Sequence, residues 1–386
     1  MAMIIRHITI KNWRNFKGAD VDLQPRQFLI GPNASGKSNF LDVFRFLRDI
    51  ATPDGGGLQK AVKDRGGVSK LRNLAARRDP EISIEVHLAV SSSAPARWRY
   101  ALGFKQEPSG QRRTLISFER VWKGNDLILD RPDDGDRDDA ERLTQTFLEQ
   151  INANHKFRDI AHFLQGVTYL HLVPQLLRHA ATIQGRPLER DPFGQGFLER
   201  LARTPSKTRK SRLGRIEKAL KIAVPQLQEL EFVQDETTGA PHLQALYSHW
   251  RPKAGWQQED QFSDGTLRLV ALLWSLLEGD QLLLLEEPEL SLHAAIAAQL
   301  APLIHRMQGS TSRQVMVSTH SEAMLADPGI DGREVLVLTP REEGTGIEVA
   351  SDIAEVRALL EGGFSVGESV LPRTRPARAE YLSSTG

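Results

Sequence analysis

The stretch that decides the fold is Gly31-Pro32-Asn33-Ala34-Ser35-Gly36-Lys37-Ser38. It fits the pattern G-x-x-x-x-G-K-[ST], in which a loop between a strand and a helix surrounds a phosphate group. Both flanking elements are indicated, because the apolar residues 28–30 precede the loop and residues 39–47 have helical apolar spacing. The stretch therefore predicts a phosphate-binding loop (P-loop), and the alternative is a glycine-rich turn that matches by chance.

The residue types of this loop suit a nucleotide. Gly31 and Gly36 allow the backbone to turn so that successive N–H groups point at a phosphate, and the following helix adds the positive end of its dipole. We expect Lys37 to reach the β- and γ-phosphates of a nucleotide and the Ser38 hydroxyl to ligate Mg²⁺. The predicted nucleotide-binding residues are Gly31, Pro32, Asn33, Ala34, Ser35, Gly36, Lys37, Ser38 and Asn39.

The composition excludes several classes of function. The 386 residues include 50 basic and 49 acidic side chains, so the net charge of +1 says nothing about a nucleic-acid partner. No cysteine is present, which excludes disulfides, thiolate metal sites and cysteine nucleophiles. The first residues lack the layout of a signal peptide, and no run approaches the roughly 18 apolar residues of a membrane span. We therefore expect a soluble cytoplasmic protein without membrane contact.

Alternating apolar and polar residues predict strands on both sides of this loop. The runs at 4–10 and 19–23 have the period of half-buried strands, with a turn expected at residues 15–18. Three further strand-like runs lie at 82–90, 97–104 and 114–121. We expect them to complete an antiparallel sheet beside the nucleotide.

An acidic segment and a change of periodicity divide the chain. Residues 130–141 carry seven acidic side chains and two arginines, which predicts a solvated linker. Helical spacing then continues to about residue 225, as at Leu143, Phe147 and Ile151. The expected parts are an N-terminal part with the P-loop at 1–135, a helical insertion at 136–225, a C-terminal part at 226–350, and a tail at 351–386 that is disordered or binds a partner.

A basic run lies within the expected insertion. Glu217 is its single acidic residue, and its basic residues are Arg203, Lys207, Arg209, Lys210, Arg212, Arg215, Lys218 and Lys221. Such a run could neutralise the phosphates of DNA. The alternative is a solvated basic helix, since no aromatic residues interleave to stack on bases.

A second apolar stretch ends in carboxylates. Residues 282–285 are four leucines, followed directly by Glu286 and Glu287. Such a run suits a strand buried on both faces of a parallel sheet, whose ligands bind at the carboxyl ends of the strands. It resembles the Walker B motif of ABC-type ATPases, in the group that includes RecF, SMC and OLD-like proteins. The resemblance implies that Glu286 is linked to Mg²⁺, where most of the superfamily has Asp, and that Glu287 is the catalytic carboxylate.

Two further motifs follow the order of that family. Residues 262–266 resemble the ABC signature sequence, in which Ser263 can cap the helix that begins there and Gly265 permits close approach. Residues 315–320 form an apolar run ending in His320, which resembles the switch histidine that contacts the γ-phosphate and the attacking water. Residues 289–293 resemble the loop that crosses the dimer interface of the family.

The N-terminal residues 12–16 also resemble the RecF-like group, in which an arginine at the place of Arg14 touches the nucleotide phosphates. The glutamine that joins Mg²⁺ to the moving lobe in the family is poorly marked. Gln59 is its only early candidate, and we do not assign it.

The resemblance implies an α/β fold, that of a P-loop NTPase with ABC-ATPase head architecture. A mixed sheet would form the core, beside an antiparallel β subdomain and a helical insertion. It also implies a head-to-tail homodimer, in which each ATP lies between the P-loop side of one protomer and Ser263 and Gly265 of its partner. The implied catalytic residues are Glu287, His320 and Lys37, and the implied magnesium ligands are Ser38 and Glu286.

The sequence leaves two biological roles open. The stretch after His320 lacks the Asp-x-Asp pair of the Toprim nuclease that OLD-type relatives carry, so we expect any effector, such as a nuclease, to be a separate protein. The first role is a sensor or scaffold ATPase in bacterial anti-phage defence. The second is a RecF-like ATPase of DNA repair that binds DNA through the basic run. The sequence has no sustained heptad pattern, so we expect no long coiled coil.

Two other classes fit less well. A transporter subunit is disfavoured by the RecF-like form of the signature. A scaffold that no longer hydrolyses ATP is disfavoured because Lys37, Glu287 and His320 are all present.

Overall fold

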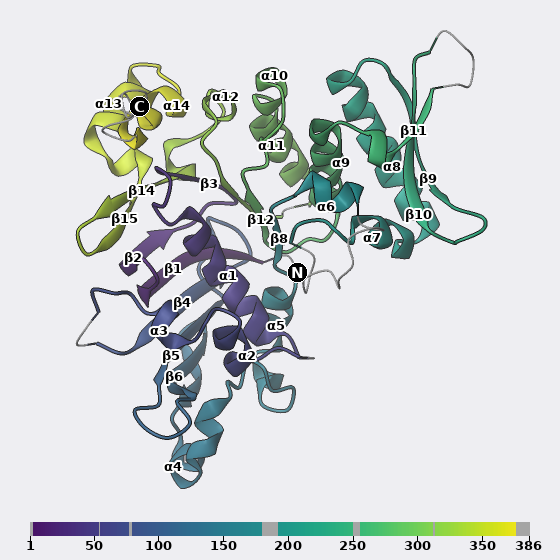
Figure 1. The fold of residues 1–386 in the computed structure, drawn as a ribbon. Coiled ribbons are helices and arrows are strands. Elements are labelled where there is room, and N and C mark those ends of the chain that lie inside the picture. The colour runs from purple at the N-terminus through teal and green to yellow at the C-terminus, as the bar shows by residue number, and fades with distance from the viewer. Residues whose placement is uncertain are drawn as a thin grey trace, which may run out of the picture.

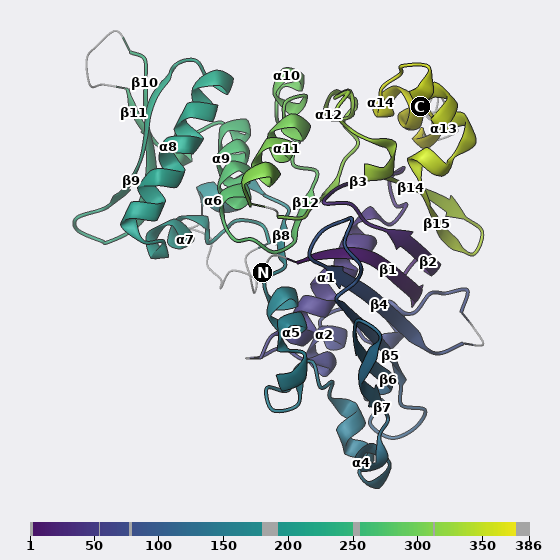
Figure 2. The same cartoon turned by 180° about the vertical axis from the view of Figure 1, so that it is seen from behind.

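The computed structural model describes residues 3–53, 55–76, 79–179, 192–249, 255–311 and 313–375. Figures 1 and 2 show a central sheet with three regions around it. An antiparallel sheet with its helices lies on one side, and the insertion with α8 lies at the far end from the C-terminal helices α13 and α14.

The central sheet has six strands in the order β15-β14-β3-β13-β12-β8. They are β3 (Arg26–Ile30), β8 (Thr168–Leu170), β12 (Leu283–Glu286), β13 (Val315–Ser318), β14 (Val335–Arg341) and β15 (Gly344–Val349). All neighbours are parallel except β15, which forms an antiparallel hairpin with β14. The carboxyl ends of β3, β8, β12 and β13 therefore lie at the same edge of the sheet. The segments that follow these strands begin at that edge. The mixed sheet expected from the sequence is confirmed.

The two faces of this sheet pack against different helices. Leu284 of β12 packs into a core with α1 and α5, whereas Leu283 and Leu285 pack into a second core with α9 and α11. These helices are α1 (Lys37–Ala51), α5 (Arg158–Gln165), α9 (Asp264–Leu277) and α11 (Leu300–Thr311). Burial of both faces explains why the short strands are apolar without alternation. It also places α1 and α9 on opposite faces of the sheet (Figures 1 and 2).

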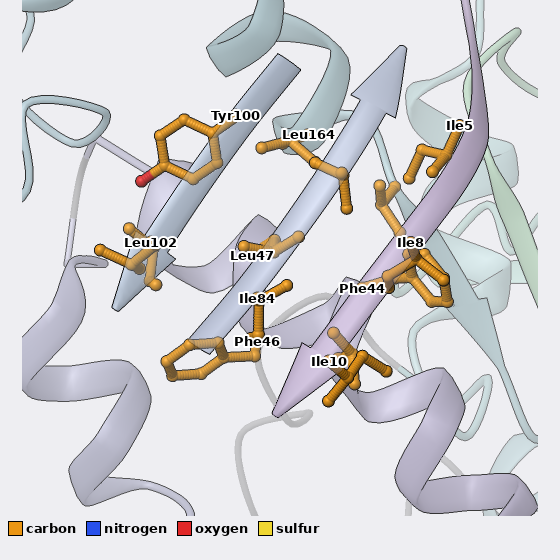
Figure 3. Packing of buried hydrophobic residues seen from close by; sticks show 14 of the residues in the cluster. Ile5, Ile8, Ile10, Phe44, Phe46, Leu47, Ile84, Tyr100, Leu102 and Leu164 are labelled. Carbon is orange, nitrogen blue, oxygen red and sulfur yellow. The ribbon is translucent and has the colours of Figure 1, made fainter. Parts of the chain in front are cut away.

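The N-terminal sheet is antiparallel, in the order β2-β1-β4-β5-β6-β7. Its strands are β1 (Ile4–Trp13), β2 (Phe16–Asp22), β4 (Ile82–Ala89), β5 (Trp98–Gln106), β6 (Thr114–Lys123) and β7 (Asp126–Arg131). The short helices α2 (Leu58–Lys63) and α3 (Val68–Leu71) precede β4. Figure 3 shows Ile8 of β1, Phe44 of α1 and Leu164 of α5 among the buried side chains that join this sheet to its helices. The three strands expected between residues 82 and 121 are confirmed as β4, β5 and β6.

The turn between β1 and β2 lies at residues 14–15, so the expected turn at 15–18 was placed too late. Phe16 is fully buried and pairs with Trp13 across the strands, which keeps it within β2. Arg14 lies in the turn and has a positive φ of 48°, a strained backbone conformation. The turn therefore comes before Phe16, because the buried side chain of Phe16 packs into the core from within the strand.

The acidic segment is largely exposed, as predicted, but it is anchored to the N-terminal sheet and is therefore not a free linker. Arg131 is fully buried, and its guanidinium contacts Glu119 at 3.0 Å and Asp136 at 2.8 Å, both also buried. Asp136 lies in the short helix α4 (Asp134–Asp138), which thereby returns to the edge of the N-terminal sheet. The prediction of a linker was wrong at Arg131 and Asp136, because a buried arginine is stabilised by acidic partners, here Glu119 of β6 and Asp136 of α4.

The expected helical insertion at 136–225 differs from the structure at both ends. Helix α5 packs against α1 in the N-terminal core, and β8 joins the central sheet beside β12. The residues at Leu143, Phe147 and Ile151 do not form one helix, since a 3-10 helix ends at Thr144 and Ile151 is exposed. Their spacing was therefore misleading.

The insertion that lies between β8 and α9 contains strands as well as helices. Its elements are α6 (Pro174–Arg178), α7 (Phe197–Arg203), α8 (Ser206–Ala223), β9 (Leu227–Gln234), β10 (Pro241–Tyr247) and β11 (Trp256–Gln258). The three strands form their own antiparallel sheet. Helix α8 buries Leu213, Ile216 and Leu220 in the second core, as its spacing predicted.

Most of the expected tail is folded. The remaining C-terminal helices are α10 (Ala294–Ala297), α12 (Glu322–Leu325), α13 (Ala354–Glu361) and α14 (Val366–Val370). The last two lie in the expected tail, where Val356, Val366 and Val370 are buried in the second core. The expectation of disorder at 351–375 was wrong because these apolar residues pack, and residues 376–386 lie outside the described part. Among the described residues, no helix has the length and apolarity that a membrane span requires.

Candidate nucleotide site

The P-loop connects β3 to α1 with little space for side chains. A Cβ on Gly31 would lie 2.6 Å from the Leu338 carbonyl, and Gly36 has a φ of 100° and faces the Asn15 amide. The Asn15 Nδ2 donates to the Ser35 carbonyl at 2.9 Å, and its Oδ1 accepts from Asn39 Nδ2 at 2.8 Å. Asn15 therefore holds the loop from the β1–β2 turn, a role that sequence reasoning missed.

Lys37 is the first residue of α1 and is almost fully buried. Its Nζ donates to the carbonyls of Gly31 at 2.9 Å and Pro32 at 3.2 Å, so the side chain folds back over the loop. Burial lowers the pKa of Lys37, and the charges of Glu287 and Glu286 oppose this shift. These interactions place the ammonium group between the loop and the two carboxylates, where it can meet the phosphates of a nucleotide.

The two carboxylates follow β12, as predicted, and they face different partners. Glu286 Oε1 accepts a hydrogen bond from the Ser38 hydroxyl, which joins the end of β12 to the first turn of α1. Glu287 has a φ of 45°, and its N–H donates to the Ser318 carbonyl of β13 at 3.0 Å. The strained backbone turns Glu287 away from the strand direction. The carboxylates of Glu286 and Glu287 therefore face different partners and cannot replace each other.

His320 lies two residues beyond β13, the strand next to β12. Its Nε2 is 3.6 Å from Glu287 Oε1. Burial and the charge of Lys37 lower the pKa of His320, and Glu287 opposes them. A neutral imidazole at this place can both accept and donate a hydrogen bond. The structure therefore brings together Lys37, Ser38, Glu286, Glu287 and His320, all of which the sequence selected.

Glu289 supports this arrangement from the loop after the carboxylates. Its Oε1 accepts from the Thr319 hydroxyl at 2.5 Å and from the His320 N–H at 3.3 Å. Burial raises the pKa of the Glu289 carboxyl. Glu289 therefore fixes the backbone that carries the histidine, and its sequence position alone did not show this role.

Two residues at the end of β8 complete the site and were also missed. The Tyr169 hydroxyl donates to Glu286 Oε2 at 2.5 Å. The His171 Nδ1 lies 3.4 Å from the Glu286 carbonyl oxygen. No motif marks these residues, because β8 is only three residues long and lies in a stretch with helical spacing.

The signature residues begin α9 on the other face of the sheet. The Ser263 hydroxyl accepts from the Thr266 N–H at 3.1 Å, which confirms the predicted cap. Asp264 accepts from Gln175 Nε2 at 2.8 Å and from Arg178 Nη2 at 2.6 Å. A Cβ on Gly265 would lie 2.8 Å from the Ser291 carbonyl, so glycine is needed where α9 meets the following loop.

Arg14 lies beside the P-loop, whereas Gln59 is held within the N-terminal part by its hydrogen bonds. Arg14 Nη2 contacts Asp42 at 2.9 Å, and the residue lines an open hollow beside Ser38 and Asn39. It lies next to the P-loop, but its charge is paired with α1. Gln59 Nε2 donates to the carbonyls of Thr114 and Thr144, both at 2.7 Å, which holds it within the N-terminal part.

The donor set of the site fits Mg²⁺. Ser38 and Glu286 supply a hydroxyl and a carboxylate oxygen within hydrogen-bonding distance of each other, and hard cations of this kind prefer oxygen ligands. A nucleotide phosphate in the P-loop would provide the remaining negative charge. We therefore expect Ser38 and Glu286 to hold the metal together with the nucleotide.

The chain is similar to known proteins over part of its length. The family model described as "AAA domain, putative AbiEii toxin, Type IV TA system" matches residues 28–326. "DNA replication and repair protein RecF" of Clavibacter michiganensis subsp. michiganensis is 28% identical over 148 residues, which are 38% of this chain and 34% of that protein. RecF of Clavibacter sepedonicus is 29% identical over 96 residues, 25% of this chain and 24% of that protein. The matches thus span no more than 34% of the length of these relatives.

Solved structures have a similar fold over most of the chain. A structure described as the SmcHead bound to the C-winged helix domain of ScpA has a TM-score of 0.51 at 14% identity and covers 89% of this chain and 97% of that chain. The Smc head domain bound to the C-terminal domain of ScpA derived from Pyrococcus furiosus also has a TM-score of 0.51, at 13% identity, and covers 94% of this chain and 100% of that chain. At these identities the likeness shows the fold alone.

Proposed function

The chain belongs to the family described as "AAA domain, putative AbiEii toxin, Type IV TA system", and from this we propose that it binds ATP with Mg²⁺, closes into a head-to-tail homodimer and hydrolyses the ATP. It is an ABC-type ATPase of the RecF and SMC group with a P-loop NTPase fold, as the sequence predicted.

The observation that carries the proposal is the convergence of five side chains at one edge of the central sheet. Lys37 would neutralise the phosphates, and Ser38 and Glu286 would hold the metal, which supplies a positive charge to the phosphoryl oxygens. Glu287 would orient or deprotonate the attacking water, and His320, 3.6 Å away, would contact the γ-phosphate and the same water. Each role uses a side chain whose position is already fixed by the contacts described above.

The placement of Ser263 supports dimerisation. Because α1 and α9 lie on opposite faces of the sheet, the α9 N-terminus would serve the nucleotide of a second protomer. A helix N-terminus attracts anions through its free N–H groups and its dipole. The γ-phosphate would therefore complete the contact between protomers, and its loss on hydrolysis would weaken that contact.

The direct test is the mass of the protein with and without ATP. We expect light scattering to show a monomer without nucleotide and a dimer with Mg²⁺ and ATP. Lys37→Ala should bind ATP at least about a hundredfold more weakly and stay monomeric, because it removes a charge that is bonded to the phosphates. A dimer that forms equally well without nucleotide, or in the Lys37→Ala variant, would contradict the proposal.

For the biological role we propose a sensor or scaffold in bacterial anti-phage defence whose effector is a separate protein. The support is the family description, which names a toxin of a TA system and hence a setting with more than one component. Co-purification of the effector from cells that express the neighbouring genes tests this role.

A specific surface favours the second candidate, a RecF-like ATPase that binds DNA. On α8, Lys207, Lys210, Lys218 and Lys221 are exposed and recur at a spacing that puts them on one helix face. Two other basic residues of the run are structural instead. Arg209 lies 4.0 Å from the Phe232 ring centroid, and Arg212 lies over Trp274 at 5.1 Å.

The structure therefore identifies which residues to change in a DNA-binding test. Lys207→Gln, Lys210→Gln and Lys218→Gln together should weaken duplex binding about tenfold and reduce its salt dependence, because each contact to phosphate releases counterions. Fluorescence anisotropy over a salt series measures both. The matched control changes three exposed lysines that lie outside the insertion, Lys63, Lys105 and Lys156. Equal losses in the two variants, or no binding by the unmodified protein, would refute the DNA-binding role.

A further inference from the structure

Glu286 is held at both of its carboxylate oxygens. Ser38 donates to Oε1, and the Tyr169 hydroxyl donates to Oε2 at 2.5 Å. Tyr169 pairs with Leu284 in the parallel register of β8 and β12, so it projects from the same face as Glu286, two residues further along. The tyrosine therefore approaches the carboxylate from the neighbouring strand, on the side opposite the P-loop serine.

The ring of Tyr169 has a fixed place. The residue is 8% exposed, and the Arg45 guanidinium lies over the ring, 4.2 Å from its centroid. Arg45 in turn lies 3.6 Å from the Asp42 carboxylate on the same face of α1. A tyrosine hydroxyl is protonated at neutral pH and can donate a hydrogen bond. The contact thus presents Glu286 with a hydrogen-bond donor on a rigid support.

A glutamate at this place needs such a donor more than an aspartate does. Its extra methylene adds one rotatable bond between the strand and the carboxylate, and free rotation must be lost when a metal is bound. Hydrogen bonds to a ligating carboxylate commonly set its orientation, and their removal lowers metal affinity by roughly 10–100-fold. A donor on β8 would offset the freedom that the longer side chain introduces.

We propose that Tyr169 is the positioning residue for the metal-linked carboxylate, fixing Glu286 so that Oε1 points at Ser38 and the magnesium position. The inference rests on the proposed function, since it assigns a role within the nucleotide site. Tyr169 acts through Glu286 and touches neither nucleotide nor metal itself.

The experiment measures metal binding apart from turnover. Mn²⁺ affinity is determined by electron paramagnetic resonance in the presence of a non-hydrolysable ATP analogue, and analogue affinity is determined in EDTA. Tyr169→Phe should weaken Mn²⁺ binding about tenfold and leave analogue binding in EDTA unchanged. Thermal unfolding shows whether the variant is folded.

A matched control uses the same substitution on another buried tyrosine–glutamate pair. The Tyr100 hydroxyl donates to Glu119 at 3.2 Å, in the N-terminal sheet and away from the P-loop. Tyr100→Phe should leave Mn²⁺ affinity unchanged, whatever it does to stability. A similar loss of Mn²⁺ affinity in both variants would overturn the proposal, because it would indicate a general structural effect.

A double-mutant cycle tests whether the effect of Tyr169 on metal binding depends on the longer side chain of Glu286. In Glu286→Asp the carboxylate is one methylene shorter and cannot reach both Ser38 and Tyr169, so adding Tyr169→Phe should cause no further loss of Mn²⁺ affinity. Additive losses would overturn the proposal, as would unchanged Mn²⁺ affinity in Tyr169→Phe. If the unmodified protein does not bind the analogue at all, the proposed ATPase function fails first, and the two failures are thereby distinguished.

Discussion

Glu287→Gln is expected to reduce ATP turnover at least about a hundredfold while ATP still binds, because a general base typically contributes 10²–10⁴-fold to the rate. The amide has nearly the size of the carboxylate but cannot accept a proton from water. Since Lys37, Ser38 and Glu286 remain intact, the ATP-bound dimer should form and persist. Radiolabelled ATP hydrolysis and light scattering measure the two effects.

The matched control for this variant is Glu229→Gln. Glu229 is an exposed residue of β9 in the insertion, so the same change of charge there should leave turnover and dimerisation unaltered. Turnover in Glu287→Gln within a fewfold of the unmodified protein would remove Glu287 from the catalytic role. The strained backbone at Glu287, with its φ of 45°, would then need another explanation.

Ser263→Arg is the second change with a large expected effect. It removes the hydroxyl that caps α9 and adds a bulky side chain where the partner's γ-phosphate would approach. We expect the monomer to keep its affinity for ATP, but dimerisation should be lost. Turnover should fall at least about a hundredfold, the scale on which a preorganised donor to a transition-state oxygen contributes.

A second serine cap controls for the loss of helix stability. Ser365 caps α14 through the Glu368 N–H at 3.3 Å, and this short helix lies in the C-terminal region. Ser365→Arg should lower thermal stability by a comparable amount and leave dimerisation intact. If Ser263→Arg also leaves dimerisation intact, the signature has no role in joining the protomers.

The residues at the sheet edge were predictable because motif and topology agree. The P-loop follows β3, the two carboxylates follow β12, and His320 follows β13, and these three strands are neighbours in the central sheet. Parallel strands bring their carboxyl ends to one edge, so an ordered series of motifs becomes a cluster of side chains. For this reason Lys37, Glu287 and His320, which the resemblance to ABC-type ATPases selected in the sequence, lie together in the fold.

Contacts across the fold were not predictable in the same way. Tyr169 reaches Glu286 from a three-residue strand whose sequence has no alternation of its own. Arg131 draws Glu119 and Asp136 into a buried network, although the segment has the composition of a linker. Both depend on which strand becomes a neighbour in space, and a local pattern of residue types contains no such information.

The predicted boundaries of the insertion were wrong for a related reason. Helical spacing continues from α5 to α8, but α5 belongs to the core beneath α1 and α8 belongs to the core beside α9. The apolar stripe of a helix shows that it packs, without showing against which partner. The strands β9, β10 and β11 lie beyond the range in which that spacing was followed.

The central claim is that each site is shared between two protomers, and a mixing experiment tests it most directly. Glu287→Gln is inactive as a dimer and Ser263→Arg is inactive because it does not pair with itself, but a mixed dimer contains one site with an intact Glu287 facing an intact Ser263. If equal amounts of the two proteins are combined before ATP is added, turnover should reappear. Its upper limit is roughly a quarter of the unmodified turnover, because random pairing would make half of the dimers mixed with one intact site each, and the altered signature disfavours that pairing. A mixture that is no more active than the two variants measured separately would contradict the shared site.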